Sequence, residues 1–115
     1  ILYCALIEQP GDLTESWLFV KNGDDNVQMM KNCMSILLKE CKSLEHVQWL
    51  QGTKAYGVHY RSVLVPLREH EGVDPNPDNW YWKQEAYMLE QLKGTNIRWT
   101  IFRPSCIWFV SASPL

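Results

Sequence analysis

The stretch Val47–Gly57, VQWLQGTKAYG, begins as a hydrophobic strand and ends in a glycine, a threonine and a lysine. Its apolar half is typical of a strand that is buried in a sheet. Such strands usually end in turn residues, namely Gly, Asn, Asp or Pro, so the ammonium group of Lys54 at this position needs an explanation. The residues that the rest of the chain brings to Lys54 therefore decide what this segment does.

Strand and helix patterns alternate on both sides of this stretch. The runs ILYCALI (1–7), EHVQWLQ (45–51) and NIRWTIFRP (96–104) are predicted strands. A helix is predicted over about 24–42, where the apolar residues that share one helical face are Val27, Met30, Met34, Leu37, Leu38 and Cys41. A second helix is predicted over 80–93, with Asp78 and Asn79 as candidate N-caps and Gly94 at its end. The order β-α-β-α-β predicts an α/β fold with a parallel sheet.

Length and composition indicate one small globular domain. The chain has 115 residues, of which 46% are hydrophobic and 21% charged, and its net charge is −2. This balance favours neither nucleic acid nor an anionic membrane as a partner. No run reaches the roughly 18 apolar residues that a membrane-spanning helix needs. The chain starts inside an apolar run without a methionine, and we therefore expect it to be a piece of a longer protein.

The four cysteines, Cys4, Cys33, Cys41 and Cys106, have irregular spacings, and with the histidines they form no metal-binding pattern. Each lies in an apolar context, so we expect buried free thiols rather than two disulfides. Free thiols indicate a reducing compartment, and we expect the protein to be cytoplasmic.

Polar residues follow two of the predicted strands, as QGTK after the second and RPS after the third. Ligands of open α/β sheets bind outside the carboxyl ends of the strands, so these residues are candidates for a site. Tyr81, in the first turn of the second helix, can meet Lys54 there. A nearby ammonium favours the phenolate of a tyrosine, and such a pair can also stabilise an oxyanion on a substrate.

Two other interpretations remain open on spacing alone. A lysine just beyond a strand is most often solvated, and a tyrosine in an aromatic first turn is most often a packing residue. Tyr56, Tyr60 and Tyr87 are equally good candidates on the same grounds.

Three segments, LQGTKAYG, NWYWKQEAYMLEQ and WTIFRPSCI, resemble in order parts of a known enzyme group. This group is the atypical short-chain dehydrogenases/reductases of the progesterone 5β-reductase and iridoid synthase type, which are NADPH-dependent enone reductases. The resemblance covers essentially the whole chain. It implies a partial Rossmann-like, doubly wound parallel sheet, in which residues 1–115 form the C-terminal half of an NAD(P)-binding domain truncated at both ends.

The resemblance also implies functional residues. The catalytic tyrosine of the group falls on Tyr81 and its catalytic lysine on Lys54, whereas usual short-chain dehydrogenases have a lysine four residues after the tyrosine, where this chain has Glu85. The residues expected to contact NADPH, or NAD as the alternative, are Gln51, Gly52, Thr53, Arg103, Pro104, Ser105 and Ile107. The expected substrate is a small carbonyl or enone compound, and a homodimer of the full-length form is allowed.

The glycine-rich phosphate loop of the group does not occur in this sequence. We therefore expect the 115 residues by themselves to bind NADPH weakly. Two alternative functions remain: an epimerase or dehydratase on the same fold, and an inactive, truncated Rossmann-like protein.

Overall fold

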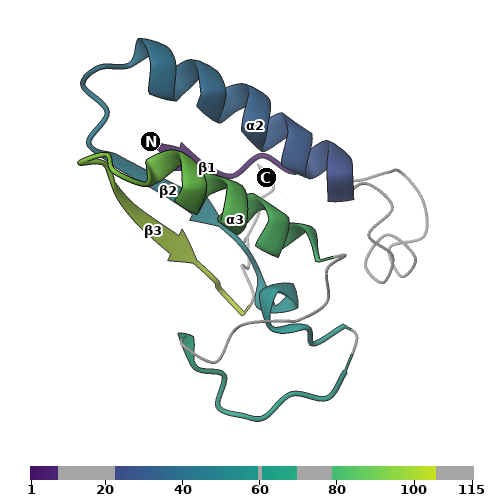
Figure 1. The fold of residues 1–115 in the computed structure, drawn as a ribbon. Coiled ribbons are helices and arrows are strands. Elements are labelled where there is room, and N and C mark those ends of the chain that lie inside the picture. The colour runs from purple at the N-terminus through teal and green to yellow at the C-terminus, as the bar shows by residue number, and fades with distance from the viewer. Residues whose placement is uncertain (8–22, 60, 70–78, 106–115) are drawn as a thin grey trace, which may run out of the picture.

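The computed structural model describes residues 1–7, 23–59, 61–69 and 79–105. Within these residues, three strands form one parallel sheet in the order β1-β2-β3 (Figure 1). The elements in chain order are β1 (Leu2–Tyr3), α2 (Gly23–Glu40), β2 (His46–Leu50), the 3₁₀ helix η1 (Thr53–Tyr56), α3 (Trp80–Leu92) and β3 (Arg98–Phe102). The predicted α/β class and the order β-α-β-α-β are thus confirmed.

The first strand is shorter than predicted. Only Leu2 and Tyr3 pair with β2, opposite Gln48 and Trp49. Further along, the backbone of Ile7 bonds to a side chain of α2 instead: its N–H donates to Asn26 Oδ1 at 2.8 Å and its carbonyl accepts from Asn26 Nδ2 at 3.1 Å. At Ile7 the backbone is therefore bonded to α2.

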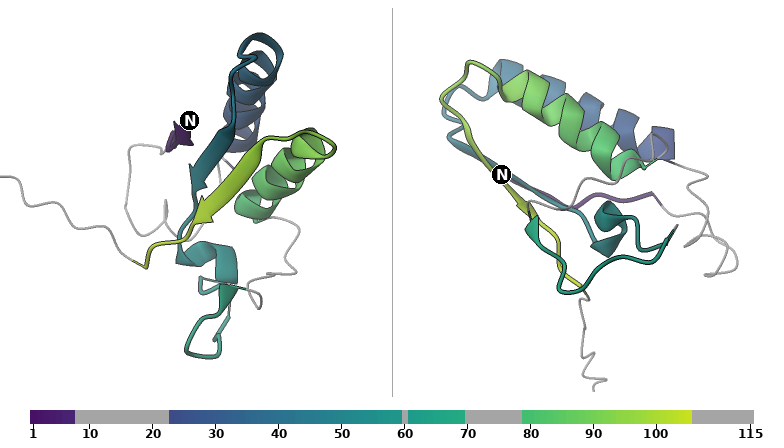
Figure 2. Two further views of the ribbon diagram at one scale, coloured as in Figure 1. Left: turned by 90° about the vertical axis from the view of Figure 1, so that its left-hand side faces the viewer. Right: turned by 60° about the horizontal axis from the view of Figure 1, so that its bottom comes forward.

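Both helices cover the same face of the sheet (Figure 2). Val47 and Trp49 of β2 point into this face, and they are 1% and 0% exposed. Against them pack Met30 and Met34 of α2 and Met88 of α3. The predicted methionine stripe is therefore core, and its flexible side chains pack in one cluster with Trp49. The indole rings of Trp49 and Trp99 lie 5.9 Å apart, measured between their centroids.

The opposite face of the sheet exposes apolar side chains. Alternation along the strands directs Leu2 and Phe102 to this face, where they are 54% and 44% exposed. Cys4 directly follows the helix-facing Tyr3 and is exposed, so the prediction that all cysteines are buried is wrong at this position. Cys33 and Cys41 are half-buried, all three are free thiols, and Cys106 lies outside the described residues.

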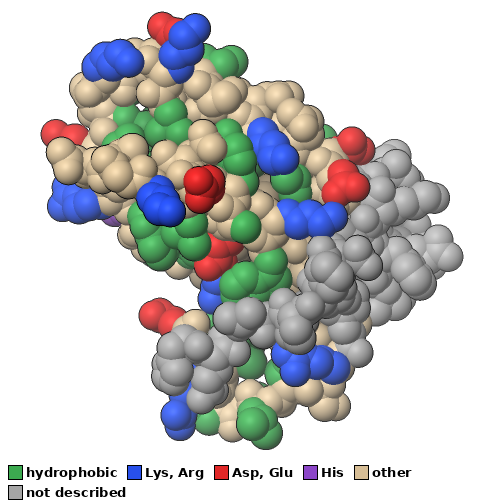
Figure 3. Space-filling model, viewed as in Figure 1, with side chains coloured by type: hydrophobic (Ala, Val, Ile, Leu, Met, Phe, Trp, Pro, Cys, Tyr) green, Lys and Arg blue, Asp and Glu red, His purple; other side chains and the backbone are tan. Residues whose placement is uncertain are grey.

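Charges of both signs are interspersed over the helix-covered side of the molecule (Figure 3). Asp24 and Asp25 occupy the first turn of α2 and Lys39 its last turn, which complements the helix dipole. None of the helices in the described part of the chain is long and apolar enough to cross a membrane.

The two faces of α2 predict different responses to truncation. Met34→Ala should lower the free energy of unfolding by about 2–5 kcal/mol, because it opens a cavity in a fully buried position. Ile36→Ala should change it by less than about 0.5 kcal/mol, because Ile36 is 63% exposed on the same helix. Urea unfolding of both variants measures the difference, and equal losses would contradict the assigned helix face.

Candidate active site

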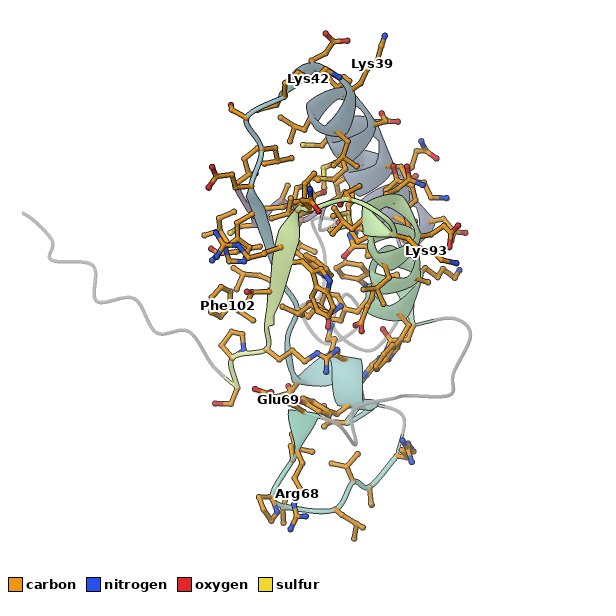
Figure 4. The ribbon with its side chains drawn as sticks, turned by 60° about the vertical axis from the view of Figure 1, so that its left-hand side comes forward. Lys39, Lys42, Arg68, Glu69, Lys93 and Phe102 are labelled. Carbon is orange, nitrogen blue, oxygen red and sulfur yellow. The ribbon has the colours of Figure 1, made fainter. Side chains whose placement is uncertain are left out.

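The carboxyl ends of β2 and β3 lie side by side at one edge of the sheet. Their pairing runs from His46 opposite Arg98 to Leu50 opposite Phe102, and the N–H of Gln51 then donates to the carbonyl of Phe102 at 2.8 Å. η1 follows β2 at this edge, and the loop that carries Arg68 and Glu69 extends beyond it (Figure 4). Lys39 and Lys42 lie at the other end of the molecule.

The first turn of α3 is hydrogen-bonded to η1. Asn79, the N-cap of α3, accepts the N–H of Tyr81 at 3.2 Å, and its Nδ2 donates to the carbonyl of Lys54 at 2.8 Å. One residue further, Trp82 Nε1 donates to the carbonyl of Ala55 at 2.9 Å. Because Asn79 is 2% exposed, both of its bonds are shielded from water.

Lys54 and Tyr81 are therefore carried by two segments that are bonded to each other. Both side chains are half-buried. The phenol oxygen of Tyr81 lies beside the backbone of Gly52, 3.7 Å from where a Cβ atom at that glycine would stand. The segments that carry Lys54 and Tyr81 thus lie together at the carboxyl edge of the sheet. The sequence predicts this placement of the two segments.

The other candidate tyrosines lie in different surroundings. Tyr87 lies in a groove of about 520 Å³ between α2 and α3, with Lys31 Nζ 5.7 Å from the centre of its ring. Burial raises the pKa of Tyr87 above its ordinary value of 10.0. Tyr56 is 9% exposed and packs under a guanidinium group. Tyr60 lies outside the described residues.

A polar network lies directly under this edge and joins Gln51, Glu85 and Arg103. Arg103 Nε donates to Gln51 Oε1 at 2.7 Å, and Arg103 Nη2 donates to Glu85 Oε2 at 2.8 Å. Gln51 Nε2 donates to the carbonyl of Tyr81 at 3.1 Å and to Glu85 Oε2 at 3.3 Å. The side chains of Arg103 and Glu85 are only 12% and 15% exposed.

This network limits how the predicted cofactor residues can act. The side chains of Gln51 and Arg103 already bond to protein groups. Their predicted contact with a cofactor would therefore have to use backbone atoms or the exposed part of each side chain. Gly52, Thr53 and Pro104 are half-buried and Ser105 is exposed, all at the same edge. Ile107 lies outside the described residues.

The residues at this edge correspond to part of a dinucleotide site by their place beyond the carboxyl ends of the strands. A Cβ atom at position 52 would stand 3.7 Å from the phenol oxygen of Tyr81, an ordinary van der Waals distance, so this contact by itself does not require a glycine. The region that would hold the pyrophosphate has no counterpart in the sequence, since no glycine-rich turn occurs before a helix. Among the described residues, no group of three side chains has the composition of a metal site.

Sequence reasoning missed two contributors to the site. In the sequence, Glu85 only marks the position where usual short-chain dehydrogenases have a lysine. In the structure its carboxylate pairs with Arg103. Asn79 was predicted as a cap, but its second bond, to the carbonyl of Lys54, was not. The signal available for the pair was weak: an acidic residue in the aromatic first half of the helix, and an arginine directly after a strand.

Comparison with known proteins finds similar chains among curated proteins. The short chain dehydrogenase gsfE of Penicillium aethiopicum is 28% identical over 113 residues, which cover 97% of this chain and 28% of that protein. The (S)-8-oxocitronellyl enol synthase ISY2 of Nepeta cataria is 26% identical over 98 residues, covering 76% of this chain and 24% of that protein. No protein-family model matches, and no solved structure matches significantly.

These matches support a relationship to the short-chain dehydrogenase/reductase family, and they do not resolve a subgroup within it. The chain spans about a quarter of the length of the curated relatives that it matches.

Asn79 offers a test of the bonds between α3 and η1. Asn79→Ala removes both the cap and the bond to Lys54, and we expect a loss of about 2 kcal/mol or more in the free energy of unfolding. Asn79→Asp keeps the capping oxygen but cannot donate to the carbonyl, so its loss should come from the second bond alone. Urea unfolding of both variants separates the two contributions. If Asn79→Ala were neutral, the attachment of α3 to η1 would not depend on this residue.

Proposed function

We propose that this chain carries the catalytic part of an NADPH-dependent reductase of enones or related carbonyl compounds. Tyr81 and Lys54 are the proposed catalytic pair. The observation that carries the proposal is the direct bonding of the first turn of α3 to the segment Gln51–Tyr56, through Asn79 and Trp82. The relationship to short-chain dehydrogenases/reductases supports redox chemistry with a nicotinamide cofactor.

The proposed domain is the C-terminal half of a Rossmann-like NAD(P)-binding domain that is truncated at both ends. Two observations support it: the parallel order β1-β2-β3, and the quarter-length coverage of the relatives. The missing glycine-rich turn would then belong to sequence outside residues 1–115. We propose NADPH rather than NADH on the resemblance of the segments around Lys54 and Tyr81 to the enone reductases. A homodimer and a cytoplasmic location remain expectations.

The residues at the carboxyl edge have separate roles in the proposed reaction. The backbone around Gly52, Thr53, Pro104 and Ser105 would hold the nicotinamide end of the cofactor, which supplies the hydride when bound. The hydroxyl of Tyr81 would donate a hydrogen bond to the carbonyl oxygen of the substrate. That oxygen gains negative charge as the conjugated system is reduced, and the ammonium group of Lys54 would stabilise this charge.

Glu85 favours this arrangement over that of an epimerase or a usual dehydrogenase. In the usual arrangement a lysine stands four residues after the tyrosine. Here that position holds Glu85, whose carboxylate is paired with Arg103 at 2.8 Å. The required cation must then come from another element, and Lys54 of η1 is bonded through its backbone to the same helix.

The catalytic pair can be tested by substitution in the protein expressed from its full reading frame. Tyr81→Phe and Lys54→Met should each lower kcat for NADPH-dependent enone reduction by about 10²–10⁴-fold. The measurement is the loss of NADPH absorbance with a panel of enones and saturated ketones. Tyr87→Phe is the matched control, because Tyr87 lies on the same helix but in the groove toward α2, and it should change kcat less than about 3-fold. Equal activity of the Tyr81 variant and the control would refute the pair.

Cofactor binding offers a second test. The 115 residues alone should bind NADPH only weakly, since the helix N-terminus and glycine-rich loop that hold the pyrophosphate are absent from this sequence. Titration followed by NADPH fluorescence compares this chain with the longer protein. Tight binding by the 115 residues would show that other groups of this chain hold the phosphates.

A further inference from the structure

We propose that Arg103 and Glu85 are positioning residues, which set the separation between Tyr81 and Lys54. The inference rests on the proposed function, because it names what holds the catalytic pair in place. It starts from the position of one guanidinium group. Arg103 follows β3, yet its side chain contacts both segments that carry the pair.

The guanidinium carbon of Arg103 lies 5.4 Å from the centre of the Tyr56 ring and 5.3 Å from the centre of the Trp82 ring. Tyr56 stands two residues after Lys54 in η1, and Trp82 directly follows Tyr81 in α3. Cations near aromatic rings are attracted by the ring quadrupole, and the attraction is stronger where water is excluded. A single cation thus contacts the neighbours of both proposed catalytic residues.

The polar bonds of this cation are directional. Its Nε and Nη2 atoms bond Gln51 and Glu85 separately, while Gln51 bonds the Glu85 carboxylate and the carbonyl of Tyr81. The contacts close a ring among β2, α3 and β3. A shift of any one element would leave a buried charge or amide without a partner, and such a group is costly in a region of low dielectric constant. The ring therefore favours one separation of the elements.

Charge gives Arg103 a second role. Glu85 stands one helical turn after Tyr81 and therefore on the same side of α3. An uncompensated carboxylate there would oppose negative charge that develops on a substrate oxygen near Tyr81. Pairing with Arg103 at 2.8 Å neutralises the carboxylate, so that the field of Lys54 is not cancelled.

The test compares Arg103→Lys and Glu85→Gln with a matched ion-pair control in the protein from its full reading frame. Lysine keeps the charge of Arg103 but lacks the planar fork that bonds two partners and stacks on two rings. Glutamine keeps the shape of Glu85 and removes its charge. The control is Asp24→Asn, which breaks the exposed Lys83–Asp24 pair between the same helix and α2.

We expect Arg103→Lys and Glu85→Gln to lower kcat by about 10–100-fold and to change KM less than about 3-fold, because small misplacements of reacting groups are costly. The kcat of the double variant should be no lower than that of the less active single variant, because both changes disrupt the same ring. Asp24→Asn should leave both constants unchanged. Thermal unfolding midpoints distinguish misplaced catalytic groups from a loss of folded protein. If Arg103→Lys does not fold, Glu85→Gln alone provides the kinetic test.

Amide hydrogen exchange makes the result independent of the substrate. In Arg103→Lys, the amides of residues 51–57 and 79–85 should exchange faster than in the wild type, whereas in Asp24→Asn they should not. If no enone is reduced by the wild type, the proposed function fails and the exchange data alone decide whether the ring holds the two segments. Unchanged exchange, or unchanged kcat in an active protein, would overturn the inference.

Discussion

The direction in which the strands follow one another is the constraint on which the rest of this structure depends. The chain moves from β1 to β2 to β3 without reversing, and both crossing helices lie on the same face of the sheet. Parallel strands then end at a common edge, and each crossing helix must return the chain to the opposite end. As a result α3 begins at the carboxyl edge, and its first turn meets the segment that leaves β2.

Within this frame, apolar packing and polar bonding make different contributions to the position of α3. Met88 and Leu92 bury the helix against Val47 and Trp49, but flexible methionine side chains tolerate small shifts along the sheet. Buried polar groups are less tolerant. Gln84 Nε2 donates to the carbonyl of Asn26 at 3.0 Å and Asn79 Nδ2 to that of Lys54 at 2.8 Å, and both bonds are satisfied at one axial position of the helix.

The segments of the fold that the sequence predicted well are those with a strong local signal. The helical spacing of Met30 and Met34 located the buried face of α2. Of the two candidate caps, Asp78 and Asn79, the structure shows Asn79 as the N-cap, where its side chain accepts the N–H of Tyr81. Trp99 points to the same face of the sheet as Trp49, yet it is 47% exposed. β3 is an edge strand of the sheet that the described residues form, and side chains of an edge strand are covered less than those of the central strand. Local pattern carries no information about the position of a strand in its sheet.

The sequence by itself determined the alternation of strands and helices and the segments that would carry Lys54 and Tyr81, because these depend on neighbours within a few residues. Only the tertiary structure decided what lies beneath that pair. Gln51, Glu85 and Arg103 are separated by 34 and 18 residues along the chain, and nothing in their local context predicts a shared ring of bonds. Such a ring exists only after three elements have packed. Burying a carboxylate or a guanidinium alone is costly, so the two groups leave water as a pair or stay solvated.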